Sequence, residues 1–225
     1  MLGSRRSLRA DALRIISRIS PLPKVFGAEN IPESGGFLIV VNHYARRGYS
    51  TAWNALSLSA ALKQEITFIM SEEWAFEGNP FAFILRPLMR AVLASINKVY
   101  GFLSMPSMVE GFNTAASRGD AVRRVLRFAR SHPQAVIGLA PEGRDSPEDG
   151  VGLAPEGGGK FMLHLNRMGF QLLPVVVIEH EGRLVIQFGE RFDFLSMDEH
   201  SPQVDQEVRE MVRGRLQSLF DRAVN

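Results

Sequence analysis

A histidine directly after an apolar run is the first residue of this sequence whose type and position suit chemistry. Residues 37–41 form an unbroken run of apolar side chains, and Asn42 and His43 follow it. Arg46 and Arg47 come next, ahead of a segment with helical spacing. A neutral imidazole is the commonest general base, and cations beside a helix N-terminus suit anions. We expect His43 to be a base and both arginines to bind substrate, whereas the alternative for such a histidine is a structural hydrogen bond to backbone.

A second polar cluster follows the apolar run 135–139. It reads Glu142-Gly143-Arg144-Asp145-Ser146, with a glycine turn between paired charges. The arrangement suits the binding of a polar or phosphorylated group, and the alternative is a surface loop closed by local side-chain bonds. Farther along, Gly157-Gly158-Gly159-Lys160 opens a helix without the spacing of a Walker motif. Its backbone amides are suited to an anion, although a plain flexible entry to the helix is the favoured explanation of the glycines.

Several other chemistries are excluded by the composition and the motifs. The 225 residues include no cysteine, which rules out disulfides, thiolate metal sites and cysteine nucleophiles. No Gly-x-Ser-x-Gly elbow, His-Glu-x-x-His helix or dinucleotide fingerprint occurs, and the five histidines are scattered. We therefore expect neither a metal nor a cofactor.

Strand-like and helix-like segments alternate along most of the chain. Strands are expected at 37–41, 66–70, 135–139, 172–178 and 184–188, with helices after residue 50, from 117 or 120 to 132, at 160–168 and at the C-terminus. This order predicts an α/β domain with a mixed, largely parallel sheet flanked by helices. Ligands of such folds gather beyond the C-terminal ends of strands, where His43 and Glu142 both fall.

The first 24 residues differ from the remainder in charge. They carry six basic residues and one acid, whereas the whole chain has a formal net charge of only +2. Their pattern predicts an amphipathic helix ended by Pro21 and Pro23, with Asp11 on its polar side. We expect 1–24 either to lie on an anionic membrane or to pack on the domain formed by 25–225. The mostly apolar stretch 79–103 contains Arg86 and Arg90, which argues for a buried or interfacial helix rather than a membrane span.

Three of these features, in this order, resemble the lysophospholipid and glycerol-3-phosphate acyltransferase family. Asn42-His43 is similar to the start of the family's His-x4-Asp motif, Pro141-Glu142-Gly143 to its Pro-Glu-Gly-Thr-Arg-Ser block, and Leu173-Pro174-Val175 to its late Ile-Val-Pro-Val strand. Lys160 fits a family lysine that precedes a short helix. The resemblance implies a glycerolipid acyltransferase fold and a histidine that removes the proton from an acceptor hydroxyl.

The same resemblance implies the substrates and the location. The hydroxyl of a lysophospholipid, glycerol phosphate or related polar lipid would attack acyl-CoA or acyl carrier protein, which are co-substrates rather than cofactors. Glu142, Gly143, Arg144 and Lys160 would help to bind the acceptor. We expect a cytoplasmic, peripheral membrane enzyme. Nucleic acid is not expected as a partner of the basic helix near 123–130, because the chain lacks an overall basic balance.

Two departures from the family pattern concern the site itself. The motif aspartate would fall five residues after His43, where the sequence has Gly48, and Arg144-Asp145 stands where the family has Thr-Arg. Loss of the carboxylate that orients a catalytic histidine costs about 10⁴ in turnover in a serine protease triad. Either another group orients His43, or the protein is a weak enzyme or a lipid-binding pseudoenzyme. The candidates for that group are Glu142, Asp145 and the hydroxyls of Tyr49, Ser50 and Thr51.

Overall fold

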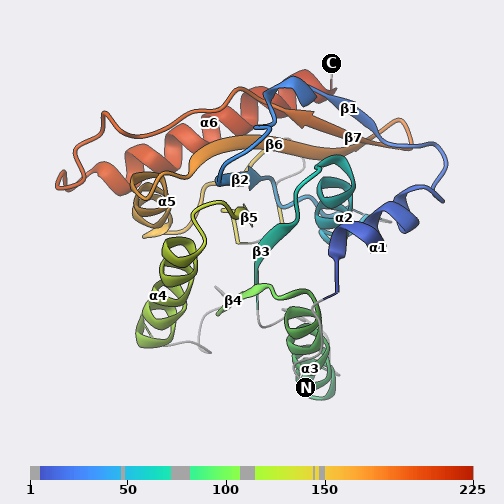
Figure 1. Ribbon diagram of the computed structural model, residues 1–225, viewed down its shortest axis with the longest axis horizontal. Helices are drawn as coiled ribbons and strands as arrows, with labels where there is room; N and C mark the ends of the chain where they lie inside the picture. Colours follow the sequence, from blue (N-terminus) through green and yellow to red (C-terminus); the bar gives the residue numbers. More distant parts are fainter. Residues whose placement is uncertain are drawn as a thin grey trace.

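A sheet with helices on both faces forms the body of the molecule (Figure 1). The computed structural model describes residues 6–46, 49–71, 82–106, 115–143, 145–146 and 150–224. Its strands are β1 (Lys24–Phe26), β2 (Phe37–Val41), β3 (Ile66–Ser71), β4 (Leu103–Met105), β5 (Val136–Leu139), β6 (Gln171–His180) and β7 (Arg183–Phe188). Its helices are α1 (Leu8–Ile16), α2 (Ala52–Ala61), α3 (Ala82–Tyr100), α4 (Ala115–Ser131), α5 (Gly158–Arg167) and α6 (Val204–Val224), with a 3₁₀ turn at Ala28–Asn30.

The strands of the described residues form one sheet in the order β1-β7-β6-β2-β5-β3-β4. Only β6 and β7 pair in antiparallel fashion, while β2 lies parallel to both of its neighbours, β5 and β6. The predicted mixed, largely parallel sheet is therefore confirmed. Because β2 and β5 are adjacent and parallel, the segments that follow them leave the sheet at the same edge.

Alternation of side chains along β2 divides the interior into two cores. Leu38 and Val40 face one core, which is completed by residues of α4, α5 and α6, and Phe37, Ile39 and Val41 face the other, which includes residues of α1 and α2. All five side chains of β2 are buried. A strand covered on both faces needs a continuous apolar sequence, which is why residues 37–41 could be recognised without periodicity.

The two outer strands of the sheet were not predicted from the sequence. β1 and β4 contain three residues each, and the β1 side chains are all exposed. Such short edge strands show too few alternations for a pattern. The basic helix also begins earlier than expected, at Ala115 rather than Ser117 or Asp120.

The predicted apolar helix near 79–103 is α3, which has Pro87 inside it. Among the described segments, no helix combines the length and the apolar character needed to cross a bilayer. The part of the stretch before residue 82 lies outside the described residues.

The N-terminal helix is shorter than the 24 residues from which it was predicted. α1 ends at Ile16, its Leu8 is buried in the core that α2 completes, and its Ala12 is fully buried. Asp11 is also buried, contrary to its expected place on the polar side, because it bonds to Arg6 and to Tyr100 of α3. The helix thus packs on the domain, while Leu13 and Ile15 remain 40% and 41% exposed.

Candidate active site

The imidazole of His43 contacts a carboxylate from the neighbouring strand's loop. His43 follows the C-terminal end of β2, and Asp145 follows β5, whose Leu139 pairs with Val40. The Nδ1 atom of His43 lies 3.0 Å from Oδ1 of Asp145. A carboxylate has no proton to donate at neutral pH, so this geometry places the imidazole proton on Nδ1 and leaves Nε2 as the basic nitrogen.

The loop that carries Asp145 is also tied to His43 through backbone. The Ser146 amide donates to the His43 carbonyl at 2.9 Å. The His43 side chain is 29% exposed and that of Asp145 is 67% exposed, so the pair is reached from solvent. Two loops from adjacent parallel strands thus present an oriented imidazole at the sheet edge where ligands of α/β folds bind.

Glu142 is buried beneath this pair, with 3% of its surface exposed. Its Oε1 accepts the His43 backbone amide at 2.8 Å and the Ser146 hydroxyl at 2.7 Å, and its Oε2 accepts the Gly152 amide at 2.5 Å. A Cβ atom at Gly152 would lie 2.7 Å from Oε2, which leaves no room for a side chain there. Glu142 therefore joins the segments after β2 and β5 to the backbone at Gly152, and its hydrogen bonds in the structure are to the chain itself.

Asn42 fixes the backbone that precedes the histidine. Its fully buried amide group accepts the Val177 backbone N–H at 2.8 Å and donates to the Val177 carbonyl at 3.1 Å. Its own carbonyl accepts from Nδ2 of Asn54, in the first turns of α2, at 2.6 Å. The side chain continues the β2–β6 ladder by one residue, which explains the Asn-His pair in structural terms.

Arg46 lies at the same edge of the sheet. Its Nη1 donates to the Ser146 carbonyl at 3.1 Å, and its guanidinium carbon lies 5.0 Å from the centre of the Tyr44 ring. Burial raises the pKa of the Tyr44 phenol, which keeps the ring neutral beneath the cation. Arg46 is thus held beside the segment that carries Asp145.

The structure separates the remaining predicted site residues into two groups. Gly143 lies in the turn after β5 with a φ of 65°, a left-handed conformation that favours glycine. Arg47, Gly48 and Arg144 lie outside the described residues. Lys160 is exposed in the first turn of α5, and in the described parts of the chain it does not contact His43, Asp145 or Glu142.

The backbone amides at the start of α5 are not free for a ligand. Asp205 of α6 accepts from the Lys160 amide at 2.9 Å and from the Gly157 amide at 3.1 Å. The anion that this helix N-terminus could bind is therefore supplied by the protein itself. The glycines serve the packing of the two helices, since a Cβ at Gly159 would lie 2.1 Å from the Asp205 carbonyl oxygen.

Comparison with known proteins identifies the fold. Neither the protein-family models nor the curated proteins give a match to this sequence. Among solved structures, the chain is similar to the 1-acyl-sn-glycerophosphate (LPA) acyltransferase PlsC from Thermotoga maritima, with a TM-score of 0.57 and 17% identity. The similarity covers 94% of this chain and 78% of the other. The chain accordingly has the fold of a glycerolipid acyltransferase, as the sequence predicted.

Asp145 is the site residue that the sequence named only as one of several candidates. The motif directed attention to position 48, five residues after the histidine. The signal that favours Asp145 is topological, because its loop follows the strand next to β2. The strand order places residues 43 and 145 side by side, and the strand order cannot be predicted from local sequence patterns.

Proposed function

We propose that this protein transfers a fatty acyl group from acyl-CoA or acyl carrier protein to a hydroxyl of a lysophospholipid, glycerol phosphate or related polar lipid. The observation that carries this proposal is the His43–Asp145 pair on an acyltransferase fold. A histidine oriented through Nδ1 by a carboxylate is the usual arrangement for a general base. Asp145 here supplies the carboxylate that the family motif would place at Gly48.

In the proposed reaction, Nε2 of His43 removes the proton from the acceptor hydroxyl as its oxygen attacks the thioester carbonyl carbon. Asp145 stabilises the imidazolium that forms. The carbon–sulfur bond of the tetrahedral intermediate then breaks, and the departing thiolate takes the proton back from Nε2. The products are an ester and a free thiol, with no acyl-enzyme. A positioned base of this kind typically contributes about 10² to 10⁴ in rate.

The polar residues around the pair are proposed to bind the acceptor. Arg46 is held beside His43 by its bond to the Ser146 carbonyl, which suits a phosphate or another anionic head group. Arg47, Gly143, Arg144 and Lys160 are further candidates from the sequence. For Glu142 we propose a positioning role, because its two oxygens accept three hydrogen bonds from the chain.

The direct test follows thiol release from purified protein with an acyl-CoA, with and without a panel of lysophospholipid and glycerol phosphate acceptors. Acceptor-dependent thiol release that His43→Ala abolishes is the expected result. Activity of His43→Ala equal to that of the parent protein would refute the role of His43. Acyl carrier protein is tested as donor in parallel, since the proposal includes both thioesters.

A second function has support from the sequence at position 48. Without the motif aspartate, the protein could be a lipid-binding member of the same fold that has lost turnover. Lipid that co-purifies with the protein, together with no thiol release for any acceptor or donor, would favour this alternative. Catalysis that depends on His43 would exclude it.

A further inference from the structure

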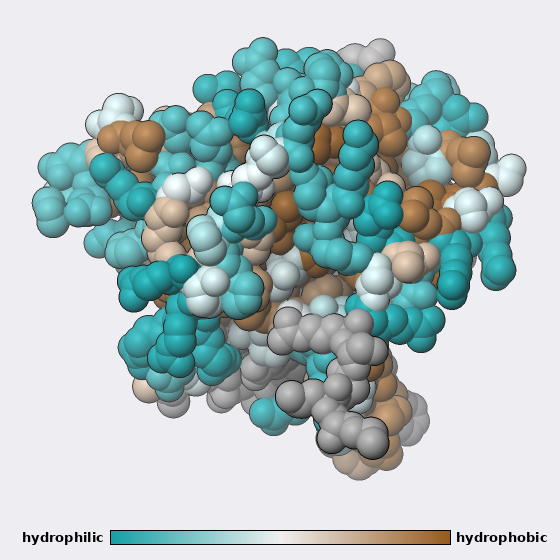
Figure 2. All heavy atoms as spheres, in the orientation of Figure 1, coloured by the Kyte–Doolittle hydropathy of each residue, from teal (hydrophilic) through white to brown (hydrophobic). Residues whose placement is uncertain are grey.

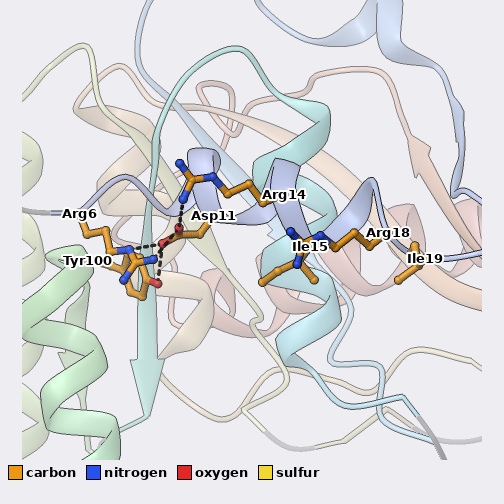
Figure 3. Close-up of a pocket in the computed structure, with 7 residues that line it drawn as sticks. All are labelled: Arg6, Asp11, Arg14, Ile15, Arg18, Ile19 and Tyr100. Carbon is orange, nitrogen blue, oxygen red and sulfur yellow. Dashed lines mark hydrogen bonds and ion pairs between the residues drawn. The ribbon is translucent and has the colours of Figure 1, made fainter.

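A groove lies between α1 and the C-terminal end of α3 (Figure 3), and none of the residues that line it is assigned to catalysis. Its volume is about 650 Å³. It is lined by Arg6, Asp11, Arg14, Ile15, Arg18, Ile19 and Tyr100. Three guanidinium groups and two isoleucines, from α1 and the residues just before and after it, thus line a cavity of the size that small ligands occupy.

The charges in this groove do not cancel. Asp11 is the only carboxylate among the described residues that line the groove, and it is already bonded to Arg6 and to the Tyr100 hydroxyl, the latter at 3.0 Å. Arg14 lies 4.0 Å from Asp11, and 74% of its side chain is exposed. The guanidinium group of Arg18 makes no hydrogen bond or ion pair with any other described residue. Two positive charges therefore remain in excess, and an anion would complete the site.

A row of exposed apolar side chains on α3, called here the apolar stripe, runs toward the end of the helix that borders this groove. Ile84, Leu88, Val92 and Val99 recur at helical spacing and are 54%, 60%, 42% and 42% exposed. Apolar side chains in such a row on one helix mark a surface that another apolar phase covers. The helix contains Arg86, Arg90 and Lys98 and not one acidic residue.

The stripe ends next to residues that line the groove. The Arg6 amide donates to the Val99 carbonyl at 2.9 Å, so the end of the stripe meets the start of the groove. In Figure 1 α3 projects from the body of the molecule below α1, and Figure 2 shows apolar surface in that lower part. A row of exposed apolar side chains thus ends at a cluster of arginines.

We propose that this α1–α3 surface docks the protein on an anionic lipid bilayer. Arg14 and Arg18 bind lipid phosphate groups, and the stripe on α3 enters the boundary between head groups and acyl chains. Charge complementarity selects this occupant: a second copy of the chain would bring its own cations against those of α3 and α1, whereas an anionic bilayer offers both phosphates and hydrocarbon. The surface is separate from His43, so its role does not depend on turnover.

The experiment measures co-sedimentation with vesicles of phosphatidylcholine alone and with added phosphatidylglycerol. Arg14→Ala/Arg18→Ala should weaken binding to the anionic vesicles by about twenty-five-fold, because each arginine near an anionic membrane contributes about a fivefold factor. Ile84→Ser/Leu88→Ser should weaken binding to both kinds of vesicle by about tenfold or more. Added salt should weaken the binding of the parent protein to anionic vesicles, as Arg14→Ala/Arg18→Ala does. It should not change the loss that Ile84→Ser/Leu88→Ser causes.

Matched controls come from other exposed positions. Arg127→Ala/Arg130→Ala removes the same charge from α4, and Leu195→Ser removes an apolar side chain that is 58% exposed, close to the 60% of Leu88. Both should bind vesicles as the parent protein does. Circular dichroism and thermal unfolding verify that each variant is folded.

Three results would overturn the proposal. If Arg127→Ala/Arg130→Ala weakened vesicle binding as much as Arg14→Ala/Arg18→Ala, binding would follow net charge alone. If Arg14→Ala/Arg18→Ala and Ile84→Ser/Leu88→Ser both bound vesicles as the parent protein does, the α1–α3 surface would have no part in membrane attachment. A parent protein that is dimeric in solution, becomes monomeric on Ile84→Ser/Leu88→Ser and keeps its vesicle affinity would make the stripe a self-association surface. Activity on water-soluble, short-chain substrates should be unaffected by all these variants, which separates this test from that of the proposed acyl transfer.

Discussion

Nδ1 of His43 and Oδ1 of Asp145 lie 3.0 Å apart although 102 positions separate the two residues in the sequence. Each follows one of two adjacent parallel strands, β2 and β5. The acyltransferase motif that the sequence resembles places a carboxylate five residues after the histidine, where this chain has Gly48. In this protein the neighbouring loop provides a carboxylate to the imidazole instead.

The first prediction concerns this carboxylate. Asp145→Asn keeps the size of the side chain but removes the charge that stabilises an imidazolium. We expect kcat for acyl transfer to fall by about 10² to 10⁴, by analogy with the loss of the orienting aspartate in a serine protease triad, with little change in the acceptor KM. Steady-state thiol release at several pH values measures both constants.

Asp145→Glu retains a carboxylate and should keep more activity than Asp145→Asn, which distinguishes orientation of His43 from a general effect on the loop. The exposed Asp198 provides a matched control, because Asp198→Asn changes the same functional group far along the chain. An Asp145→Asn variant with the parental kcat and pH profile would show that another group orients the histidine.

Glu142 is the subject of the second prediction. Its oxygens accept three hydrogen bonds in a buried environment, and Glu142→Gln replaces one acceptor oxygen by a donor that faces N–H or O–H groups. We expect the free energy of unfolding to fall by about 2 kcal/mol or more, since unsatisfied buried groups cost about 1 to 3 kcal/mol each. Urea unfolding of this variant beside the exposed Glu190→Gln measures the difference.

A binding role for Glu142 would give a different result. If the carboxylate chiefly contacted the acceptor, Glu142→Gln would raise KM and leave the unfolding midpoint where it is. The sequence alone could not separate these outcomes, because a Glu that follows a strand is equally suited to both.

The sequence was most informative where burial constrains composition. Residues 37–41 had to be apolar because β2 is covered on both faces, and the alternation of strands and helices was sufficient for the fold class. The short strands β1 and β4 left no pattern, since edge strands of three residues need little apolar character. Resemblance to an ordered set of motifs provided the remaining constraint.

The site was predicted less completely, because its contacts cross between elements. Asp145 could be named as a candidate but not chosen, and Asp205 could not be associated with the glycine-rich loop from 45 residues away. Asp11 was placed on the polar side of α1 by helical periodicity, whereas its partner Tyr100 belongs to α3. Periodicity describes one helix at a time and carries no information about a partner from another.

The third prediction concerns Asp11 and acid. Its hydrogen bond to Arg6 holds the pKa of the Asp11 carboxyl below its ordinary value of 3.8, with burial opposing and the Tyr100 hydroxyl adding to the decrease. A carboxyl whose pKa is lower in the folded state stabilises the fold above its unfolded-state pKa and loses this contribution as pH falls through the folded value. The stability that Asp11 contributes should therefore be lost below about pH 4.

Asp11→Asn should remove this part of the pH dependence, so that its unfolding free energy differs from the parent's most at neutral pH and least in strong acid. Tyr100→Phe removes one of the two hydrogen bonds and should give an intermediate curve. Urea unfolding between pH 2.5 and 7 compares the three proteins. Parallel curves for the parent protein and Asp11→Asn would contradict the assigned cause.

The last prediction separates Lys160 from the helix that carries it. Asp205 accepts two backbone amides at the start of α5 from a position on α6, so Asp205→Ala should lower the free energy of unfolding by about 1 to 2 kcal/mol, as the loss of a helix cap does. Asp205→Asn keeps an oxygen acceptor and should lose less. Lys160→Ala leaves these amides bonded and should unfold as the parent protein does, while raising the acceptor KM if the exposed ammonium binds the head group. An unchanged KM for Lys160→Ala would show that this lysine does not belong to the proposed site. Residues 157–160 would then have only a structural role, in the contact between the start of α5 and Asp205 of α6.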